Sequence, residues 1–417
     1  MNVLFIVTGL GKASGITTFV ENVAAELRKC GHLVDILTKS SPDSERLNLS
    51  SYDVVHIHGL WSPWLHTLAK KIRKLRRSPT RPLSLSSKLY PLSSPPTPAL
   101  YPYTHSPLLV WSPHGMLQKW ALKNKFWKKF LALALYQWRD LHSADLLHAT
   151  AQSEVEDIRR LGLRNRVVIA PLGVRNQEVK VEGVGVQRKV KTLLFVSRVQ
   201  RKKGLPNLIH AWSRLSKIEA KNEGEGEQGT RRFLTDGWQV RIVGPDEDNH
   251  TAELIAMCQR LGLSWAKRSC ADRGIPRGVG TQVSPNLAGP EGTCVPEVSF
   301  EGPKYDDELA AEYDAADLFV LPTHSENFGS VVIESLAHGV PVITTKEAPW
   351  AELEEFKCGW WIDDSVKALV VALKDALTKA VTLPAMGARG RSLVEARYTW
   401  SAVCEKLVRG YEGEVRA

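Results

Sequence analysis

The sequence predicts an α/β protein of two lobes, each built on a parallel β-sheet. Short apolar runs such as Val3–Val7 alternate with longer amphipathic segments such as Thr17–Cys30, which is the pattern of strands and helices in such a sheet. The same alternation starts again at Thr192, after a polar stretch. The 417 residues suffice for two or three domains, and 43% hydrophobic with 24% charged residues is typical of globular proteins.

Net charge and cysteine content limit the ligands and the cellular compartment that we expect. The formal net charge is +10, from 55 basic and 45 acidic residues, which suits a phosphorylated ligand, an anionic membrane surface or simple solubility. The six cysteines lack C-x-x-C spacing, so the sequence suggests neither a zinc site nor a disulfide framework. Met1–Val7 is too short for a signal peptide and lacks its basic start, and no run of about 18 apolar residues occurs. We therefore expect a cytoplasmic protein.

The first lobe, residues 1–173, begins with a strand, a glycine-containing loop and a helix. Gly9, Gly11 and Gly15 lie in this loop, which could bring backbone amides close to a phosphate or to an acceptor. Their spacing differs from G-x-G-x-x-G, and no acidic residue is clearly placed for a nicotinamide ribose. A dinucleotide site is therefore disfavoured.

Two further strands are expected at His32–Leu37 and Val54–His58. Alternation places His56 and His58 on one face of the second of these strands. Ligands gather at the carboxyl ends of parallel strands, so His58 is a candidate for contact with an acceptor. A hydrogen-bonded structural pair is the alternative, and a metal site is disfavoured because no third ligand is nearby.

Residues 78–107 interrupt the first lobe between the helix Leu65–Leu75 and the strand Leu108–Trp111. They are rich in Ser, Pro, Leu and Tyr, which predicts an irregular insertion. His114 follows the strand that comes next and is a second candidate at a strand end.

Residues 119–139 are predicted to form one strongly patterned helix. Its apolar face carries Trp127, Phe130, Leu131, Ala134, Leu135 and Trp138, and its lysines are Lys119, Lys123, Lys125, Lys128 and Lys129. One interpretation is an interfacial helix that rests on anionic lipid. The other is a helix that packs on the core and has a solvated basic side.

A polar linker over 174–190 leads to the second lobe, residues 191–383, which opens with the strand Thr192–Ser197. Arg198 and Lys203 follow this strand. A planar guanidinium fork and a compact ammonium both suit a diphosphate, and a solvated basic loop is the alternative. Terminal helices are expected over 384–417.

Two insertions are expected in the second lobe, over 217–232 because it is polar and rich in Glu and Gly, and over 267–303 because it lacks periodicity. Asp246-Glu-Asp248 matches a D-x-D metal motif, but it falls in a loop after a strand, so metal binding is disfavoured.

The most informative stretch follows the apolar strand Leu318–Leu321. Pro322 ends the strand, and a helix opens at Gly329. The amides around Phe328, Gly329 and Ser330 are then left unpaired at a helix N-terminus, where the macrodipole favours an anion. We expect a phosphate there.

Glu326 and Glu334 bracket this turn, eight residues apart. At helical rise this separation is at most about 12 Å, roughly the span from a sugar to the ribose of a nucleotide sugar. The alternative is that Glu326 caps the helix and Glu334 is a solvated helix residue.

These features resemble the donor-site signature of retaining glycosyltransferases of family four. The resemblance rests on Glu326-x₇-Glu334, with Asn327-Phe328-Gly329 after the first Glu and His338-Gly-Val-Pro-Val-Ile343 downstream. It extends to Ser197-Arg198, to Lys203-Gly204 before a helix, and to His114-Gly115. It implies the GT-B fold, in which two Rossmann-like lobes face each other across a cleft and the last helix commonly crosses back to the first lobe.

The resemblance also implies residue roles. Glu326 would lie by the donor sugar, Glu334 would hold the ribose, Arg198 and Lys203 would bind the diphosphate, and His114 would contact the sugar and its phosphate. Asn327, Phe328, Gly329 and Ser330 complete the implied donor site, and Gly11 and Gly15 are candidates for approaching donor or acceptor.

The sequence thus predicts a retaining hexosyltransferase that moves a sugar from a nucleotide-diphosphate donor to a hydroxyl of a saccharide or lipid-linked acceptor, in cell-surface polysaccharide or glycan biosynthesis. The cationic pair would take the place of a metal, so we expect no cofactor, no metal and no nucleic-acid partner. Segment 119–139 leaves open a peripheral contact with the inner face of the membrane. The alternatives are a non-catalytic nucleotide-sugar-binding or membrane-associated scaffold, and an epimerase or phosphorylase on the same fold.

Overall fold

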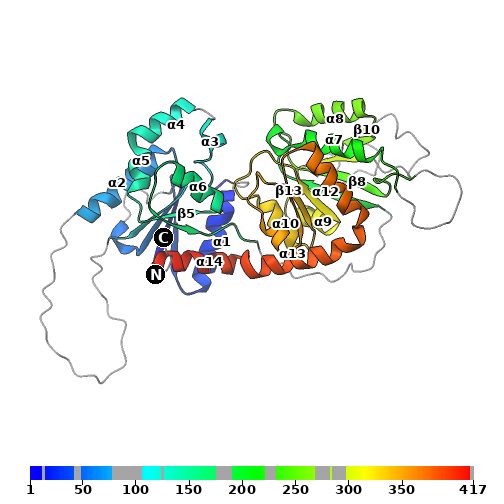
Figure 1. Cartoon of the computed structure of the whole chain (residues 1–417). Helices are drawn as coiled ribbons and strands as arrows, with labels where there is room; N and C mark the ends of the chain where they lie inside the picture. The colour runs from blue at the N-terminus through cyan, green and yellow to red at the C-terminus, as the bar shows by residue number, and fades with distance from the viewer. Residues whose placement is uncertain are drawn as a thin grey trace, which may run out of the picture. The chain divides into compact units, whose positions relative to one another are not determined.

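The computed structural model describes residues 1–11, 15–41, 48–77, 106–123, 126–174, 190–220, 232–267, 282–283 and 297–413. Two compact units make up the chain (Figure 1). The first comprises Met1–Leu172 together with Trp400–Ala417, and the second comprises Gly173–Thr399. Most of the linker over 174–190, and most of the predicted insertions over 78–107, 217–232 and 267–303, lie outside the described residues.

The first unit contains a six-stranded parallel sheet in the order β2-β1-β3-β4-β5-β6. Its strands are β1 (Asn2–Val7), β2 (Leu33–Thr38), β3 (Val54–His58), β4 (Leu108–Ser112), β5 (Leu146–Ala149) and β6 (Arg166–Ile169). Since β2 and β3 lie on opposite sides of β1, the chain changes direction there. Such a topological switch point is where ligands of open α/β sheets bind, at the carboxyl ends of the strands.

Helices cover both faces of this sheet. They are α1 (Gly15–Lys29), η1 (Leu49–Ser51), α2 (Pro63–Arg77), α3 (Lys119–Lys123), α4 (Phe126–Ala132), the π-helix η2 (Leu133–Gln137), α5 (Trp138–His142), α6 (Gln152–Arg160) and α14 (Trp400–Glu412). Along β1, Leu4 and Ile6 belong to the core under α2, α5 and α6, whereas Phe5 belongs to the core under α1 and α14. The alternating side chains of one strand thereby build two cores.

The single helix predicted over 119–139 is wrong. Three α-helices and one π-helical turn occupy the described part of this segment instead, and residues 124–125 lie outside it. The apolar periodicity continues through the π-turn, so the sequence pattern alone does not show the change in winding.

The second unit contains an eight-stranded sheet in the order β10-β9-β11-β8-β7-β12-β13-β14. Its strands are β7 (Lys191–Val196), β8 (Trp238–Val243), β9 (Trp265–Lys267), β10 (Gln282–Val283), β11 (Val298–Gly302), β12 (Leu318–Leu321), β13 (Val342–Thr345) and β14 (Gly359–Ile362). All neighbouring strands pair in parallel except β10 and β9, which are antiparallel. Because β8 and β12 flank β7 on opposite sides, this sheet also has a switch point, at β7 and β12.

The prediction of an insertion over 267–303 is wrong for Val298–Gly302, which form strand β11. This strand pairs with both β8 and β9 and is therefore an internal strand of the sheet. Ser299 and Glu301 interrupt its apolar pattern, yet both are buried, and Glu301 lies 3.5 Å from Arg241. Because this strand contains one member of a buried ion pair, the hydrophobic pattern of the sequence does not identify it.

The helices of the second unit pack against one another as well as on the sheet. They are η3 (Arg201–Lys203), α7 (Leu205–Leu215), α8 (His250–Leu261), α9 (Asp306–Asp314), α10 (Ser330–Ala337), α11 (Glu352–Glu355), α12 (Val366–Thr378), η5 (Ala380–Thr382) and α13 (Leu383–Arg397). Helix α7 packs against α8 and α12, and α10 packs against α13. None of the helices in the described ranges is long and apolar enough to cross a bilayer.

Candidate functional site

Two loops meet at the switch point of the second unit, one after β7 and one after β12. Lys203 in η3 forms an ion pair with Glu326 in the loop before α10, although 123 residues separate them in sequence. Their side chains are only 9% and 16% exposed. The tertiary structure therefore brings the cationic motif and the first motif carboxylate together in a largely desolvated place.

The close approach of these loops requires a glycine. Gly204 has φ +68°, and a Cβ atom there would lie 1.8 Å from the carbonyl oxygen of Pro322. The His324 amide also donates to the Lys202 carbonyl at 2.9 Å. Direct backbone packing therefore sets the position of Lys203 relative to the β12 loop.

Arg198 lies at the same end of the sheet but in a more open place. Its guanidinium is 58% exposed and donates to Glu247 at 2.9 Å. An exposed pair of this kind contributes little to stability, so a phosphate could replace Glu247 at low cost. Burial lowers the pKa of the neighbouring Lys202.

The predicted anion site lies at the N-terminus of α10 (Ser330–Ala337). Gly329, at φ +80°, precedes the helix and offers no side chain to cap it. The alternative that Glu326 caps the helix is wrong, because one carboxylate oxygen pairs with Lys203 and the other accepts from the adjacent Asn327 amide at 3.2 Å. The positive end of the α10 dipole is therefore suited to an anion.

Trp350 holds this turn, a contact that sequence reasoning missed. Its indole Nε1 donates to the carbonyl of Phe328 at 2.5 Å, and the two rings lie 5.1 Å apart. Tyr398 packs against both rings. Trp350 is 22 residues from Phe328, so no local pattern predicts the contact.

Glu334 lies one turn into α10 and is partly buried, and its bond to Tyr313 favours a fixed carboxylate over the alternative of a solvated helix residue. The Tyr313 hydroxyl donates to its carboxylate at 2.9 Å. Burial raises the pKa of Glu334, while hydrogen bonds from Tyr313 and Ser330 oppose that increase. Tyr313 was not predicted as a site residue, because the sequence shows only a hydroxyl at an otherwise apolar helix position.

In the first unit, histidines gather at the carboxyl ends of β3, β4 and β5. The rings of His56 and His58 stack at 4.1 Å, which confirms that both lie on one face of β3. His56 bonds the Ser112 hydroxyl, which in turn bonds His148. His58 is 1% exposed and bonds His114 at 2.9 Å, so its position does not support direct acceptor contact.

His114 and Gly115 form a turn with left-handed backbone at both residues, φ +51° and +73°. The Gly115 amide donates to the buried Glu154, which also accepts from the Thr150 amide at 2.8 Å. Burial raises the pKa of Glu154. This carboxylate, missed by sequence reasoning, holds the turn that presents His114.

The glycine loop is only partly described. Gly11 is exposed, and Gly15 is the first residue of α1, but residues 12–14 lie outside the described ranges. The roles of Gly11 and Gly15 remain predictions. In the D-x-D candidate, Asp246 accepts from the Thr251 amide at 3.1 Å, and the intervening Glu247 pairs with Arg198.

The segment after α3 presents a large apolar surface. The aromatic surface, as we name it, comprises Phe126, Trp127, Phe130, Leu131, Leu135 and Trp138, with exposed fractions of 49%, 77%, 54%, 59%, 70% and 40%. The alternative of a core-packing helix is wrong for these side chains.

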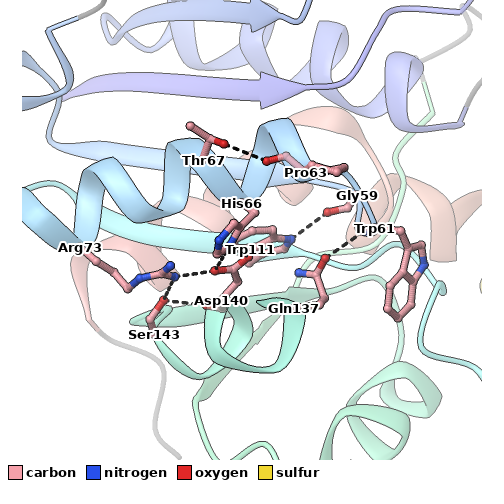
Figure 2. A network of polar contacts seen from close by, with 10 residues as sticks. All are labelled: Gly59, Trp61, Pro63, His66, Thr67, Arg73, Trp111, Gln137, Asp140 and Ser143. Atoms are coloured by element: carbon pink, nitrogen blue, oxygen red, sulfur yellow. Dashed lines mark hydrogen bonds and ion pairs between the residues drawn. The ribbon is translucent and has the colours of Figure 1, made fainter. Parts of the chain in front are cut away.

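Polar contacts anchor this segment to the sheet (Figure 2). The Gln137 side chain accepts from the Trp61 amide at 2.9 Å, just beyond the end of β3. Asp140 is fully buried and pairs with both His66 and Arg73 of α2. These contacts fix the position of the segment that carries the aromatic surface.

Two family models match the chain. Residues 14–173 match the glycosyl transferase 4-like domain, and residues 295–393 match glycosyl transferases group 1. A D-inositol 3-phosphate glycosyltransferase of Corynebacterium urealyticum is 24% identical, with 97% of this chain and 91% of that protein aligned. The corresponding Frankia alni enzyme is 34% identical over 55% of this chain and 46% of its own length.

Other relatives match over shorter segments. A sulfoquinovosyl transferase of Arabidopsis thaliana is 31% identical over 28% of this chain, which spans about a quarter (23%) of that protein's length. Among solved structures, sucrose-phosphate synthase of Thermosynechococcus elongatus superposes with a TM-score of 0.63 at 16% identity, covering 99% and 98% of the two chains. Anabaena HepE, in complex with UDP-glucose, superposes at 0.62 and 14% identity, covering 99% of both.

The two family models together match more than half of the chain, and the solved structures share the fold of two parallel-sheet Rossmann-like units. The chain therefore belongs to the group 1 glycosyltransferases of family four, which have the GT-B fold.

Proposed function

We propose that the protein is a retaining glycosyltransferase that moves a hexose from a nucleotide-diphosphate donor to a hydroxyl of an acceptor. The observation that carries this proposal is the Lys203–Glu326 ion pair beside the N-terminus of α10. It combines a cation and helix amides for phosphate with a carboxylate for sugar hydroxyls. Glu334, further along α10, binds the ribose in this proposal.

The residues present suit transfer without a resident metal. Lys203 and Arg198 supply positive charge where the diphosphate leaves, and α10 adds its dipole. Lys203 shifts from Glu326 toward the phosphate, which frees Glu326 for the sugar. The donor phosphate accepts the proton of the incoming hydroxyl on the face from which it departs, so no side chain acts as nucleophile. His114 contacts the sugar and its phosphate.

We infer the acceptor class from the relatives. The name of the Frankia alni relative contains D-inositol 3-phosphate, and a mannosyltransferase of Mycobacterium tuberculosis, 32% identical over 28% of this chain, has phosphatidylinositol monomannoside in its name, which is a lipid-linked saccharide. A saccharide or lipid-linked hydroxyl acceptor in polysaccharide or glycan biosynthesis is the corresponding proposal for this chain.

Calorimetric titration with UDP, GDP and ADP tests the donor site. We expect one nucleotide to bind and Glu334→Ala to weaken it by about tenfold or more, because a bond from a charged group to the ribose is lost. Absence of binding by a folded protein would contradict the proposal and favour a scaffold role.

Lys203 has a separate test. Lys203→Met is expected to lower turnover by on the order of 100-fold or more, because it removes charge stabilisation of the leaving diphosphate. It is also expected to cost stability, since the largely buried Glu326 is left unpaired. The double variant Lys203→Met/Glu326→Gln removes both charges and restores stability but not turnover. Normal turnover in either variant would refute the assignment.

We also propose that the aromatic surface rests on an anionic bilayer at the cytoplasmic face. Six large apolar side chains would bury area in the lipid boundary. The exposed Lys123 and Lys128 lie in the same segment, so its charge complements anionic headgroups rather than a neutral partner.

Vesicle sedimentation tests this contact. Leu135→Ser should weaken binding to phosphatidylserine-containing vesicles by about tenfold or more, from the apolar burial it removes. Leu33→Ser is the matched control, since Leu33 and Leu135 are both 70% exposed. Equal effects of the two variants, or a stable dimer in place of lipid binding, would contradict the membrane proposal.

A further inference from the structure

The side chains of His58 and His114 are joined by one hydrogen bond. His58 Nδ1 lies 2.9 Å from His114 Nε2, and the rings stack at 5.2 Å with 25° between their planes. Phe5 and Phe19 pack against His58, and Phe19 also packs against His114. One hydrogen bond therefore links two imidazoles that pack against the rings of Phe5 and Phe19.

The other nitrogens of the pair differ in surroundings. His58 Nε2 is buried and has no hydrogen-bond partner in the described part of the chain. His114 is only partly buried, and its Nδ1 bonds no described residue. A ligand atom can therefore satisfy Nδ1 of His114, whereas nothing in the described structure satisfies Nε2 of His58.

This asymmetry selects a tautomer. If His114 donated the shared proton, His58 would carry its own proton on Nε2, and a buried N–H would have no acceptor. If His58 donates from Nδ1, the unsatisfied atom is a lone pair. Buried N–H groups without an acceptor are rarer than under-satisfied acceptors, which favours donation by His58. His114 then accepts at Nε2 and carries its proton on Nδ1.

The turn fixes where that proton points. His114 has φ +51°, a backbone conformation that is uncommon for residues other than glycine. The bond from the Gly115 amide to Glu154 holds this conformation. Burial lowers the pKa of His114 to about 3, so the imidazole is neutral at neutral pH and has one proton to place.

We propose that His58 is a positioning residue that holds His114 as the Nδ1–H tautomer, so that a neutral imidazole donates a hydrogen bond to an oxygen of the donor sugar or its phosphate. The ligand end of this inference rests on the proposed function. The tautomer itself is a property of the first unit alone.

Two substitutions of His58 separate positioning from space filling. His58→Asn keeps an amide near the position of Nδ1 that can donate to His114 but loses ring volume. His58→Phe keeps a ring but loses the donor. For a positioning role we expect kcat to fall roughly 10–100-fold in His58→Phe, with a smaller change in KM, and to be largely rescued in His58→Asn. A purely structural role predicts the opposite order.

The decisive measurement is ¹⁵N NMR of histidine-labelled full-length protein without donor, with the His114 signals identified by their loss in His114→Gln. We expect a protonated Nδ1 and an unprotonated Nε2 in the wild type and in His58→Asn, and mixed tautomers in His58→Phe. A wild-type His114 protonated on Nε2, or one unaltered in His58→Phe, would overturn the inference. Because this spectrum needs no turnover, it is independent of the sugar-transfer proposal, whose own failure would show as an inactive wild type.

Discussion

At the residue scale, the two carboxylates of the candidate donor site have different partners, one charged and one neutral. Glu326 has the ammonium of Lys203, whereas Glu334 has the neutral hydroxyl of Tyr313 and lies where burial raises its pKa. An acid with a raised pKa is ionised only above that value. Nucleotide binding through an ionised Glu334 should therefore weaken as the pH falls through this raised pKa.

Tyr313→Phe tests this contact. Removing a bond that stabilises the carboxylate is expected to raise the pKa of Glu334 further and to weaken nucleotide binding by about fivefold, about 1 kcal/mol, more at pH 5.5 than at pH 7.5. Calorimetric titration at both pH values measures this. Tyr411→Phe is the matched control, because Tyr411 is a buried tyrosine of the first unit that bonds His56 at 2.8 Å. Equal effects of both variants on binding would contradict the role of Tyr313.

At the element scale, the position of α10 depends on its crossing with α13. A Cβ atom at Gly387 would lie 1.7 Å from the carbonyl oxygen of Gly339, so the backbones touch. The sequence shows only a glycine inside a helix, which propensity rules count as unfavourable. The close approach explains why glycine is present.

The variant Gly387→Ala separates the effect of helix propensity from the effect of close packing against the Gly339 backbone. Helix propensity alone predicts a gain of about 1 kcal/mol in the free energy of unfolding. Because the Gly339 backbone would have to move, we expect a net loss of about 1–3 kcal/mol and weaker nucleotide binding at α10. Urea unfolding measures the first and titration the second. Ala388→Gly, the control at the next position, should cost about 1 kcal/mol with unchanged binding, and a more stable Gly387→Ala variant would contradict the packing argument.

At the scale of the whole molecule, the two units should respond differently to acid. In the first unit His56, His58 and His148 are buried and His114 is partly buried, and burial lowers the pKa of His114 to about 3 and of His148 to about 4. It also lowers the pKa of His56 and His58 well below 6.5. A histidine with a depressed folded pKa contributes stability that is complete above about pH 6.5 and falls as the pH drops toward the folded pKa.

We therefore expect the first unit to unfold at lower urea concentration as the pH falls from 6.5 to 4. Each such histidine contributes at most about 1.4 kcal/mol per pH unit, reached where its unfolded form is protonated and its folded form is not. His148→Gln should reduce the slope by one such contribution, and His210→Gln, which removes an exposed histidine of the second unit, should not change it. Tryptophan fluorescence at several pH values measures the slope, and a pH-independent first transition would refute the account.

Much of the fold could be predicted from local pattern. Strands β3 and β12 have their predicted bounds, and α10 begins one residue after the glycine that was expected to open it. Strand β11 could not be predicted because its buried Glu301 depends on a distant arginine. The partners of the site residues were likewise invisible, since Tyr313, Trp350 and Glu154 make contacts that no local spacing specifies.

The sequence by itself determined the two-lobed α/β class, the family and the candidate donor-site residues, because strand and helix periodicity and motif spacing are local properties. Only the tertiary structure decided that Lys203 meets Glu326, that His58 faces His114 instead of solvent, and that the apolar side chains after α3 are exposed. Each of these depends on burial and on contacts between distant segments. The same residue can be solvated, paired or buried according to what the rest of the fold places beside it.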